Sequence, residues 1–85
     1  MPDYVEPHTP VEQKLAEIWQ QVLGVDMVGT ADRFDDLGGN SLVAAIIFSK
    51  IESTFDIKIP MATLLHAPTV ELLARKIQGL IDLKD

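Results

Sequence analysis

The sequence contains no cysteine, so neither a disulfide framework nor a thiolate metal site can hold the chain together. Nothing in it requires an oxidising compartment, and we expect a cytoplasmic protein. It also lacks an apolar run long enough to span a membrane, and residues 1–10 are polar and proline-rich rather than basic and then apolar. We therefore expect neither secretion nor membrane anchoring.

Basic residues are few, with 7 Lys and Arg against 13 Asp and Glu, which gives a formal net charge of -6. Such a charge opposes binding to nucleic acid phosphates or anionic lipid and favours encounters with basic protein surfaces. The expected partners are proteins, with no nucleic acid and no membrane among them.

The chain is also short. At 85 residues it forms one domain, which can bury only about 60–65% of the surface that its unfolded form exposes. The hydrophobic share of 47% and the charged share of 24% are those of an ordinary soluble domain. We therefore expect a fold built from a few well-patterned elements, without a large catalytic cleft.

Capping signals and periodicity predict four helical segments and no strand. The first begins at Thr9 and Pro10, with Glu12 placed for a capping box, and ends at Gly24. Its predicted core stripe comprises Val11, Leu15, Ile18, Trp19 and Val22.

The second predicted helix covers residues 41–55, which contain neither glycine nor proline. A short third segment covers residues 61–65, and the last helix begins at Pro68 and Thr69. The predicted core faces of the second and last helices comprise Ala44, Phe48, Ile51, Phe55, Val70, Leu73, Ile77 and Ile81. Residues 9–82 are the predicted domain, with 1–8 as a linker-like tail and 83–85 as a C-terminal tail.

Residues 24–40 break the helical pattern with glycines and aspartates, and they predict a long loop. Loops beyond about 12–15 residues tend to be functional or disordered, and isolated apolar anchors argue here against disorder. These anchors are Val25, Val28, Phe34 and Leu37. We also expect Met27 and Met61 to fill gaps in the core and Leu65 to contribute to it.

Ser41 stands where this loop meets the second helix. Gly38 and Gly39 permit a tight turn, so the serine hydroxyl should be presented at a corner of the fold. A helix N-terminus would favour a phosphate there by roughly 0.3–1 kcal/mol. On the local pattern alone, however, a simple N-cap role for Ser41 or Asn40 is the more economical interpretation.

Enzyme and metal sites find little support in the sequence. A nucleophile elbow needs a second glycine two residues after the serine, where Val43 stands. The only histidines, His8 and His66, are not placed to act as a base. A calcium loop fails because Phe34 occupies a ligand position and no glutamate closes the loop. We predict no catalytic residue and no metal site.

Residues 37–42 form the pattern Leu-Gly-Gly-x-Ser-Leu, matched by Leu37, Gly38, Gly39, Ser41 and Leu42. This pattern resembles the attachment motif of peptidyl carrier (thiolation) domains of nonribosomal peptide synthetases. The resemblance extends to the Leu-Ala-x-Ile-Trp run of residues 15–19, to Asp32 and Phe34, and to the Pro-Thr-Val of residues 68–70. Asp35 and Asn40 depart from the usual pattern, which leaves the neighbouring domain undetermined.

The resemblance implies an all-α four-helix bundle of acyl-carrier type, with a short third helix and a long loop between the first two helices. It implies that Ser41 carries 4′-phosphopantetheine, with Gly38, Gly39 and Asn40 shaping the turn. A phosphopantetheinyl transferase would attach the arm using coenzyme A and magnesium. The arm would carry aminoacyl or peptidyl thioesters between adenylation, condensation and thioesterase-type domains in antibiotic or secondary metabolite biosynthesis. The domain itself would be a monomeric substrate and shuttle rather than an enzyme.

Two alternatives stay open at this point. An acyl carrier protein of a polyketide or fatty-acid synthase would share the fold, the serine and the arm. An unmodified acidic interaction module would use the same helices for docking alone. Modification of Ser41 distinguishes the second alternative from a carrier.

The second helix has more apolar residues than its core face can use. A rotation of 100° per residue places several of them opposite that face, beside Ser41. An exposed apolar patch is a natural partner-binding surface. The predicted docking residues are Leu42, Val43, Ile46, Ile47 and Lys50.

Overall fold

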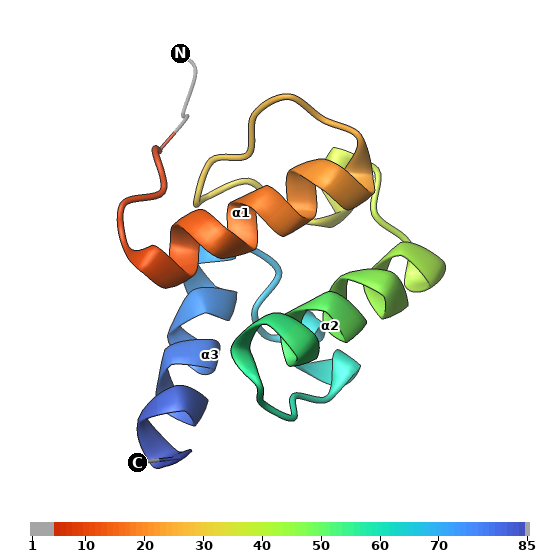
Figure 1. Cartoon of the computed structure of the whole chain (residues 1–85). Coiled ribbons are helices and arrows are strands. Elements are labelled where there is room, and N and C mark those ends of the chain that lie inside the picture. Colours follow the sequence, from red (N-terminus) through yellow and green to blue (C-terminus); the bar gives the residue numbers. More distant parts are fainter. Residues whose placement is uncertain (1–4, 85) are drawn as a thin grey trace.

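A computed structural model describes residues 5–84 as an all-helical fold (Figure 1). In chain order the elements are α1 (Pro10–Leu23), the 3₁₀-helix η1 (Asp35–Leu37), α2 (Ser41–Phe55), the 3₁₀-helix η2 (Met61–Leu65) and α3 (Val70–Lys84). Between residues 5 and 84 there is no named strand, which confirms the all-α prediction. The expected short third helix is η2, so this part of the chain holds three α-helices rather than four. Five residues after Pro60 are too few to offset the cost of nucleating an α-helix.

Both ends of α1 follow the predicted capping chemistry. The Thr9 hydroxyl accepts a hydrogen bond from the Glu12 amide at 3.1 Å, and the Glu12 carboxylate accepts one from the Thr9 amide at 3.4 Å. At the other end, Gly24 adopts a left-handed conformation with φ of 70°, and its amide donates to the Gln20 carbonyl at 2.9 Å. Local sequence therefore fixes the length of α1.

The core forms where α1 packs against both α2 and α3. In the view of Figure 1, α1 lies above the other two helices. Most of the predicted core is buried, whereas Val22, Phe55 and Ile81 are only half-buried. The most deeply buried large side chains include Leu15, Trp19, Ile47, Ile51, Leu73 and Ile77.

The long loop between α1 and α2 is held to its surroundings by backbone hydrogen bonds. The Thr30 amide donates to the Val5 carbonyl at 2.8 Å, and the Thr30 carbonyl accepts from the Glu71 amide at 3.0 Å. Val28 and Phe34 are buried, as predicted, and η1 adds a helical turn that the sequence did not predict. The start of α3 therefore sets the course of the loop.

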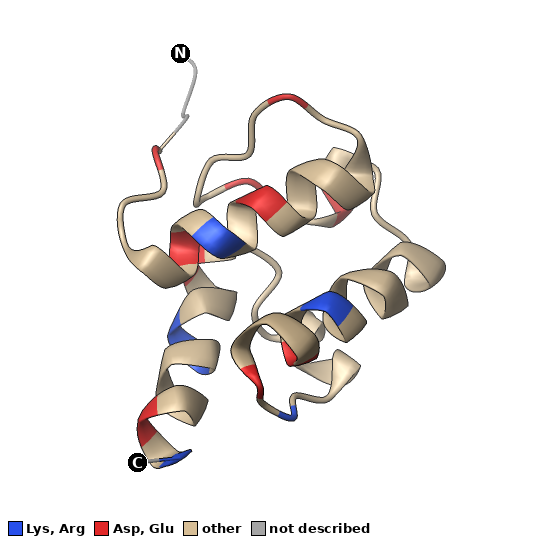
Figure 2. Cartoon of the chain, in the orientation of Figure 1, with Lys and Arg blue, Asp and Glu red and all other residues tan. Residues whose placement is uncertain are grey.

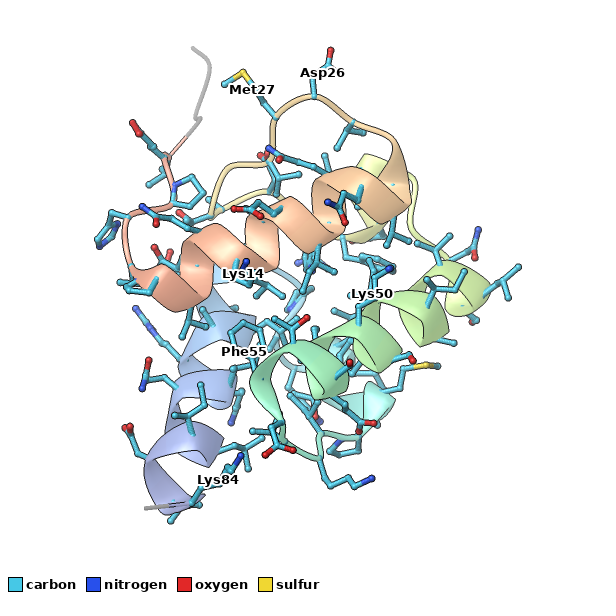
Figure 3. The ribbon with its side chains drawn as sticks, viewed as in Figure 1. Lys14, Asp26, Met27, Lys50, Phe55 and Lys84 are labelled. Carbon is cyan, nitrogen blue, oxygen red and sulfur yellow. The ribbon has the colours of Figure 1, made fainter. Side chains whose placement is uncertain are left out.

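Three core predictions are wrong. Met27 is 58% exposed, Met61 42% and Leu65 82%. Met27 lies at the outer edge of the loop, beside Asp26 (Figure 3). Met61 and Leu65 belong to η2, which packs against α2 and is too short to turn all of its apolar side chains toward it.

An ion pair joins the end of α3 to the end of α2. Asp56, in a left-handed conformation with φ of 55°, ends α2, and α3 continues through Lys84. The Lys84 ammonium donates to the Asp56 backbone carbonyl and, at 2.9 Å, to the Asp56 carboxylate Oδ2.

We predict that Asp56 titrates below an ordinary aspartate, because the hydrogen bond and the charge of Lys84 lower the pKa of its carboxyl. With the folded pKa below the unfolded one, the ion pair stabilises the fold at higher pH and is lost as the pH falls through the folded pKa. Lys84→Met should raise the pKa of Asp56 in a carboxyl NMR titration. Lys76→Met, on the same helix, should leave it unchanged. An unaltered titration in Lys84→Met would show that the ion pair does not form in solution.

Candidate functional site

Ser41 is the first residue of α2 and is exposed. The N-cap is Asn40, whose side-chain oxygen accepts a hydrogen bond from the Val43 amide at 3.0 Å. The N-cap role that the local pattern allowed for either residue therefore belongs to Asn40. Because the Ala44 amide makes the first helical bond, to the Asn40 carbonyl at 2.8 Å, the amides of Ser41 and Leu42 precede the helical ladder. The helix start around the Ser41 hydroxyl therefore favours negative charge.

Two glycines precede Ser41 for two different physical reasons. Gly38 has φ of 93°, a conformation that favours glycine, and its amide donates to the Asp35 carbonyl at 3.2 Å. Gly39 is not in that region. A Cβ at Gly39 would instead lie 2.3 Å from Cε2 of Phe34, closer than any real contact allows. Gly38 is needed for its backbone conformation, and Gly39 is needed because the Phe34 ring leaves no room for a side chain.

Phe34 connects this turn to the core. Its carbonyl accepts from the Gly39 amide at 3.1 Å, and its own amide donates to the Pro68 carbonyl at 2.8 Å. Its ring packs edge-on against Trp19, with centroids 5.5 Å apart and planes at 71°. Since Trp19 is fully buried, the position of the turn is set by contacts with the middle of the domain.

An open groove of about 570 Å³ begins at Ser41 and runs between the start of α2 and η2. The sequence did not predict this groove, because Met61 and Leu65, which line it, were expected in the core. Its apolar lining includes Ala44, Met61, Ala62, Leu64 and Leu65, and its polar lining includes Arg33 and Asp35. The Arg33 Nε atom lies 3.3 Å from Asp35 Oδ1.

The two histidines lie at the ends of helices. His8 Nδ1 lies 3.3 Å from the Glu12 carboxylate at the start of α1, and His66 ends η2. Over residues 5–84, no group of three or more His, Asp or Glu side chains is arranged to hold a metal ion. Across the same residues, no helix is both long and apolar enough to cross a membrane.

The predicted docking residues divide into three kinds. Leu42 is 72% exposed, Ile46 is 43% exposed, and Lys50 is also exposed. Val43 is half-buried and packs against the core. Ile47 is only 1% exposed, so its assignment to the outer face is wrong.

The error at Ile47 has a geometric cause. The buried stripe of α2 is Ala44, Ile47, Phe48 and Ile51, which is the i, i+3, i+4, i+7 pattern of a helix face. The predicted stripe was Ala44, Phe48, Ile51 and Phe55, whereas in the structure Ile47 joins the buried stripe and Phe55 is only half-buried. The exposed large apolar side chains of α2 are therefore Leu42 and Ile46, both in its first two turns.

The sequence of the chain matches a protein-family model and several curated proteins. The family model described as "Phosphopantetheine attachment site" matches residues 13–77. Gramicidin S synthase 2 of Brevibacillus brevis is 44% identical over 75 residues, which cover 88% of this chain and 2% of that protein. Tyrocidine synthase 3 of Brevibacillus parabrevis is 46% identical over 72 residues, or 85% of this chain and 1% of that protein. The chain thus spans only a small part of these curated relatives.

Solved structures show the same similarity at the level of the whole domain. A peptidyl carrier protein in complex with the phosphopantetheine transferase Sfp and coenzyme A aligns with a TM-score of 0.86 and 37% identity, covering 89% of this chain and 99% of that one. A prototype peptidyl carrier domain of modular peptide synthetases aligns at 0.78 and 39%, covering 88% and 99%. The A-PCP protein McyG, complexed with phenylalanyl-adenylate, aligns at 0.84 and 31%, covering 88% of this chain and 12% of that one.

We predict that Gly39→Ala destabilises the domain by about 1–3 kcal/mol, because the added methyl meets the Phe34 ring. In a Phe34→Leu background the same substitution should cost at least about 1 kcal/mol less, since the ring is gone. Urea unfolding followed by Trp19 fluorescence measures both values.

Gly79→Ala is the matched control. It lies within α3, and a Cβ there would have open space around it. It should stabilise the domain by about 0.5–1 kcal/mol through helix propensity. An equal cost of Gly39→Ala in both backgrounds would show that Phe34 is not the reason for this glycine.

Proposed function

Because the chain belongs to the phosphopantetheine-attachment family, we propose that Ser41 is the residue that receives the 4′-phosphopantetheine arm. We further propose that the loaded domain carries aminoacyl or peptidyl groups between the catalytic domains of a nonribosomal peptide synthetase. The observation that carries this proposal is the position of Ser41, exposed at the first turn of α2 directly after the glycine turn.

The surroundings of Ser41 suit a covalently attached phosphodiester. Asn40 supplies the N-cap, so the serine hydroxyl is not needed for that role. The positive end of α2 favours the negative charge that a phosphodiester would bring. Phe34 holds the preceding turn in place, so the hydroxyl is presented in a defined position to a partner enzyme.

We propose that a transferase performs the attachment, since among residues 5–84 no histidine lines the groove beside Ser41. The hydroxyl oxygen attacks the phosphorus of coenzyme A that bears the pantetheine arm. A new oxygen–phosphorus bond forms, the pyrophosphate bridge breaks, and adenosine 3′,5′-bisphosphate leaves. The serine proton passes to a base of the transferase, and magnesium would supply positive charge to stabilise the leaving group.

Once attached, the arm supplies a thiol that holds the cargo as a thioester. The contribution of this chain is to anchor the arm at one fixed point and to present a surface that partner domains recognise. A tethered cargo reaches successive active sites at a high effective concentration without diffusing away. We therefore propose that the domain acts as a substrate of its partners rather than as an enzyme.

The proposed partners follow from this role. They are a phosphopantetheinyl transferase, an adenylation domain that loads the cargo, and condensation and thioesterase-type domains that consume it. Solved complexes of similar carriers with the first two support their inclusion. We propose a cytoplasmic, monomeric domain, in keeping with an acidic chain that contains no cysteine.

We predict that incubation with coenzyme A, magnesium and a promiscuous phosphopantetheinyl transferase adds one phosphopantetheine group to the chain. Intact mass gives the stoichiometry and peptide mapping locates the group. Ser41→Ala should keep its helical circular dichroism spectrum and take up none. Ser49→Ala and Ser53→Ala are matched controls, because both serines are exposed within α2 and lack the glycine turn. Modification of either of these serines instead would refute the assignment, and an unmodified folded domain would favour the interaction-module alternative.

We predict that Ile46→Asp lowers kcat/KM for modification about tenfold, because a partner that reaches Ser41 must cover this exposed apolar side chain. Its effect on the free energy of unfolding should stay within about 1 kcal/mol. Phe48→Asp should destabilise the fold by about 4 kcal/mol or more, since it buries an unpaired charge. Thermal melts measure the stability of both variants, and transferase kinetics measure their rates of modification. Equal destabilisation by both variants, or modification of Ile46→Asp at the wild-type rate, would show that this face is not a docking surface.

A further inference from the structure

The chain enters α1 along a path that is fixed at two points (Figure 1). The His8 amide donates a hydrogen bond to the Glu12 carboxylate at 3.1 Å, and Glu12 is itself buried at the start of α1. Further back, the Val5 carbonyl accepts a hydrogen bond from the Thr30 amide at 2.8 Å. Residues 5–8 therefore form a strap that runs from the α1–α2 loop to the start of α1.

Thr30 passes this connection on to α3. It is 2% exposed, and its carbonyl accepts a hydrogen bond at 3.0 Å from the amide of Glu71, in the first turn of α3. Thr30 thus bonds to the entering chain through its amide and to α3 through its carbonyl. Because a buried backbone group without a partner is costly, both bonds hold this residue in place.

The two sides of this connection differ in strength. On the α3 side, an antiparallel bridge pairs Arg33 with Thr69, and the Phe34 amide donates to the Pro68 carbonyl at 2.8 Å. On the other side, a single hydrogen bond joins the strap to the loop within the described part of the chain, and Val5 is 46% exposed. The strap is therefore the part of the connection that opens most readily.

We propose that the strap is a releasable clamp that fixes the direction in which the chain enters the domain relative to α3. With the strap closed, Thr30 ties the entering chain to α3. With the strap open, the entering chain pivots at His8, beside Glu12. The clamp itself does not depend on modification of Ser41. Its use rests on the proposed function, in which a carrier needs both a fixed and a mobile attachment to reach successive catalytic domains.

Pro7 favours the closed strap. It is half-buried and lies between the two anchors, Val5 and His8. Its ring restricts the backbone, so the chain loses less conformational entropy when the strap closes. Pro7→Gly should therefore open the strap about two- to fivefold more often.

Two measurements on the full chain test the clamp. Because the sequence contains no cysteine, cysteines introduced at two chosen positions accept spin labels there alone. Glu6→Cys places one label on the strap and Leu83→Cys places the other in the last turn of α3, and both positions are exposed. The distance distribution between the labels, from pulsed dipolar spectroscopy, gives the direction of chain entry relative to α3. Hydrogen exchange of the Thr30 amide in the chain without labels gives the frequency of opening.

We expect a narrow distance distribution in the labelled chain. Pro7→Gly should broaden it and should speed Thr30 exchange about two- to fivefold. Pro60→Gly is the matched control, because it makes the same substitution at the start of η2, outside the strap. It should leave both the distribution and the exchange rate unchanged.

The outcomes separate the clamp from the proposed function. A broad distribution in the labelled chain, or a narrow one that Pro7→Gly leaves unaltered, would overturn the clamp. Equal effects of Pro7→Gly and Pro60→Gly would also overturn it, because they would indicate a general loosening of the fold. Intact mass after incubation with coenzyme A and the transferase tests the modification of Ser41 in the same samples, so a failed clamp in a modified chain leaves the proposed function standing.

Discussion

The contact between Phe34 and Gly39 is the constraint on which the site depends. The Phe34 ring occupies the space that any side chain at position 39 would need. The same residue bonds through its backbone to Gly39 and Pro68, and its ring packs against the buried Trp19. One aromatic residue, through its backbone and its ring, therefore links α1, the segment before α3 and the turn before Ser41. Movement of the turn is opposed by the packing of the whole core, because interiors are close-packed.

The features that the sequence predicted correctly are those with local causes. The start of α1 follows from Thr9 and Glu12, which lie three residues apart, and its end follows from Gly24. The exposure of Ser41 at the start of α2 follows likewise from the residues beside it. Whether Ser41 or Asn40 caps the helix did not follow, since both side chains are good caps. Only the course of the backbone before α2 assigns that role to Asn40.

The predictions that were wrong concern side chains whose burial depends on residues distant in the sequence. Periodicity predicted a buried stripe on α2 but did not fix its orientation, and in the folded chain Ile47 is buried. Leu65 and Met61 are of residue types that are often buried in a core, yet η2 contacts too little of the fold to bury them. The groove is a space between the loop, α2 and η2, so no single segment encodes it. Its two ends are Ser41 and a pair of side chains that were expected inside the core.

The charge of the chain explains how such apolar surface can stay exposed. Figure 2 shows acidic residues on α1, on the loop that follows it and near the end of α2. With a net charge of -6, two copies repel one another before their apolar surfaces meet. A partner with a basic surface is attracted instead, and Leu42 and Ile46 are the exposed large apolar residues of α2. In the proposed function, long-range charge would select the partner and short-range apolar contact near Ser41 would position it, so the two roles would fall on different residues.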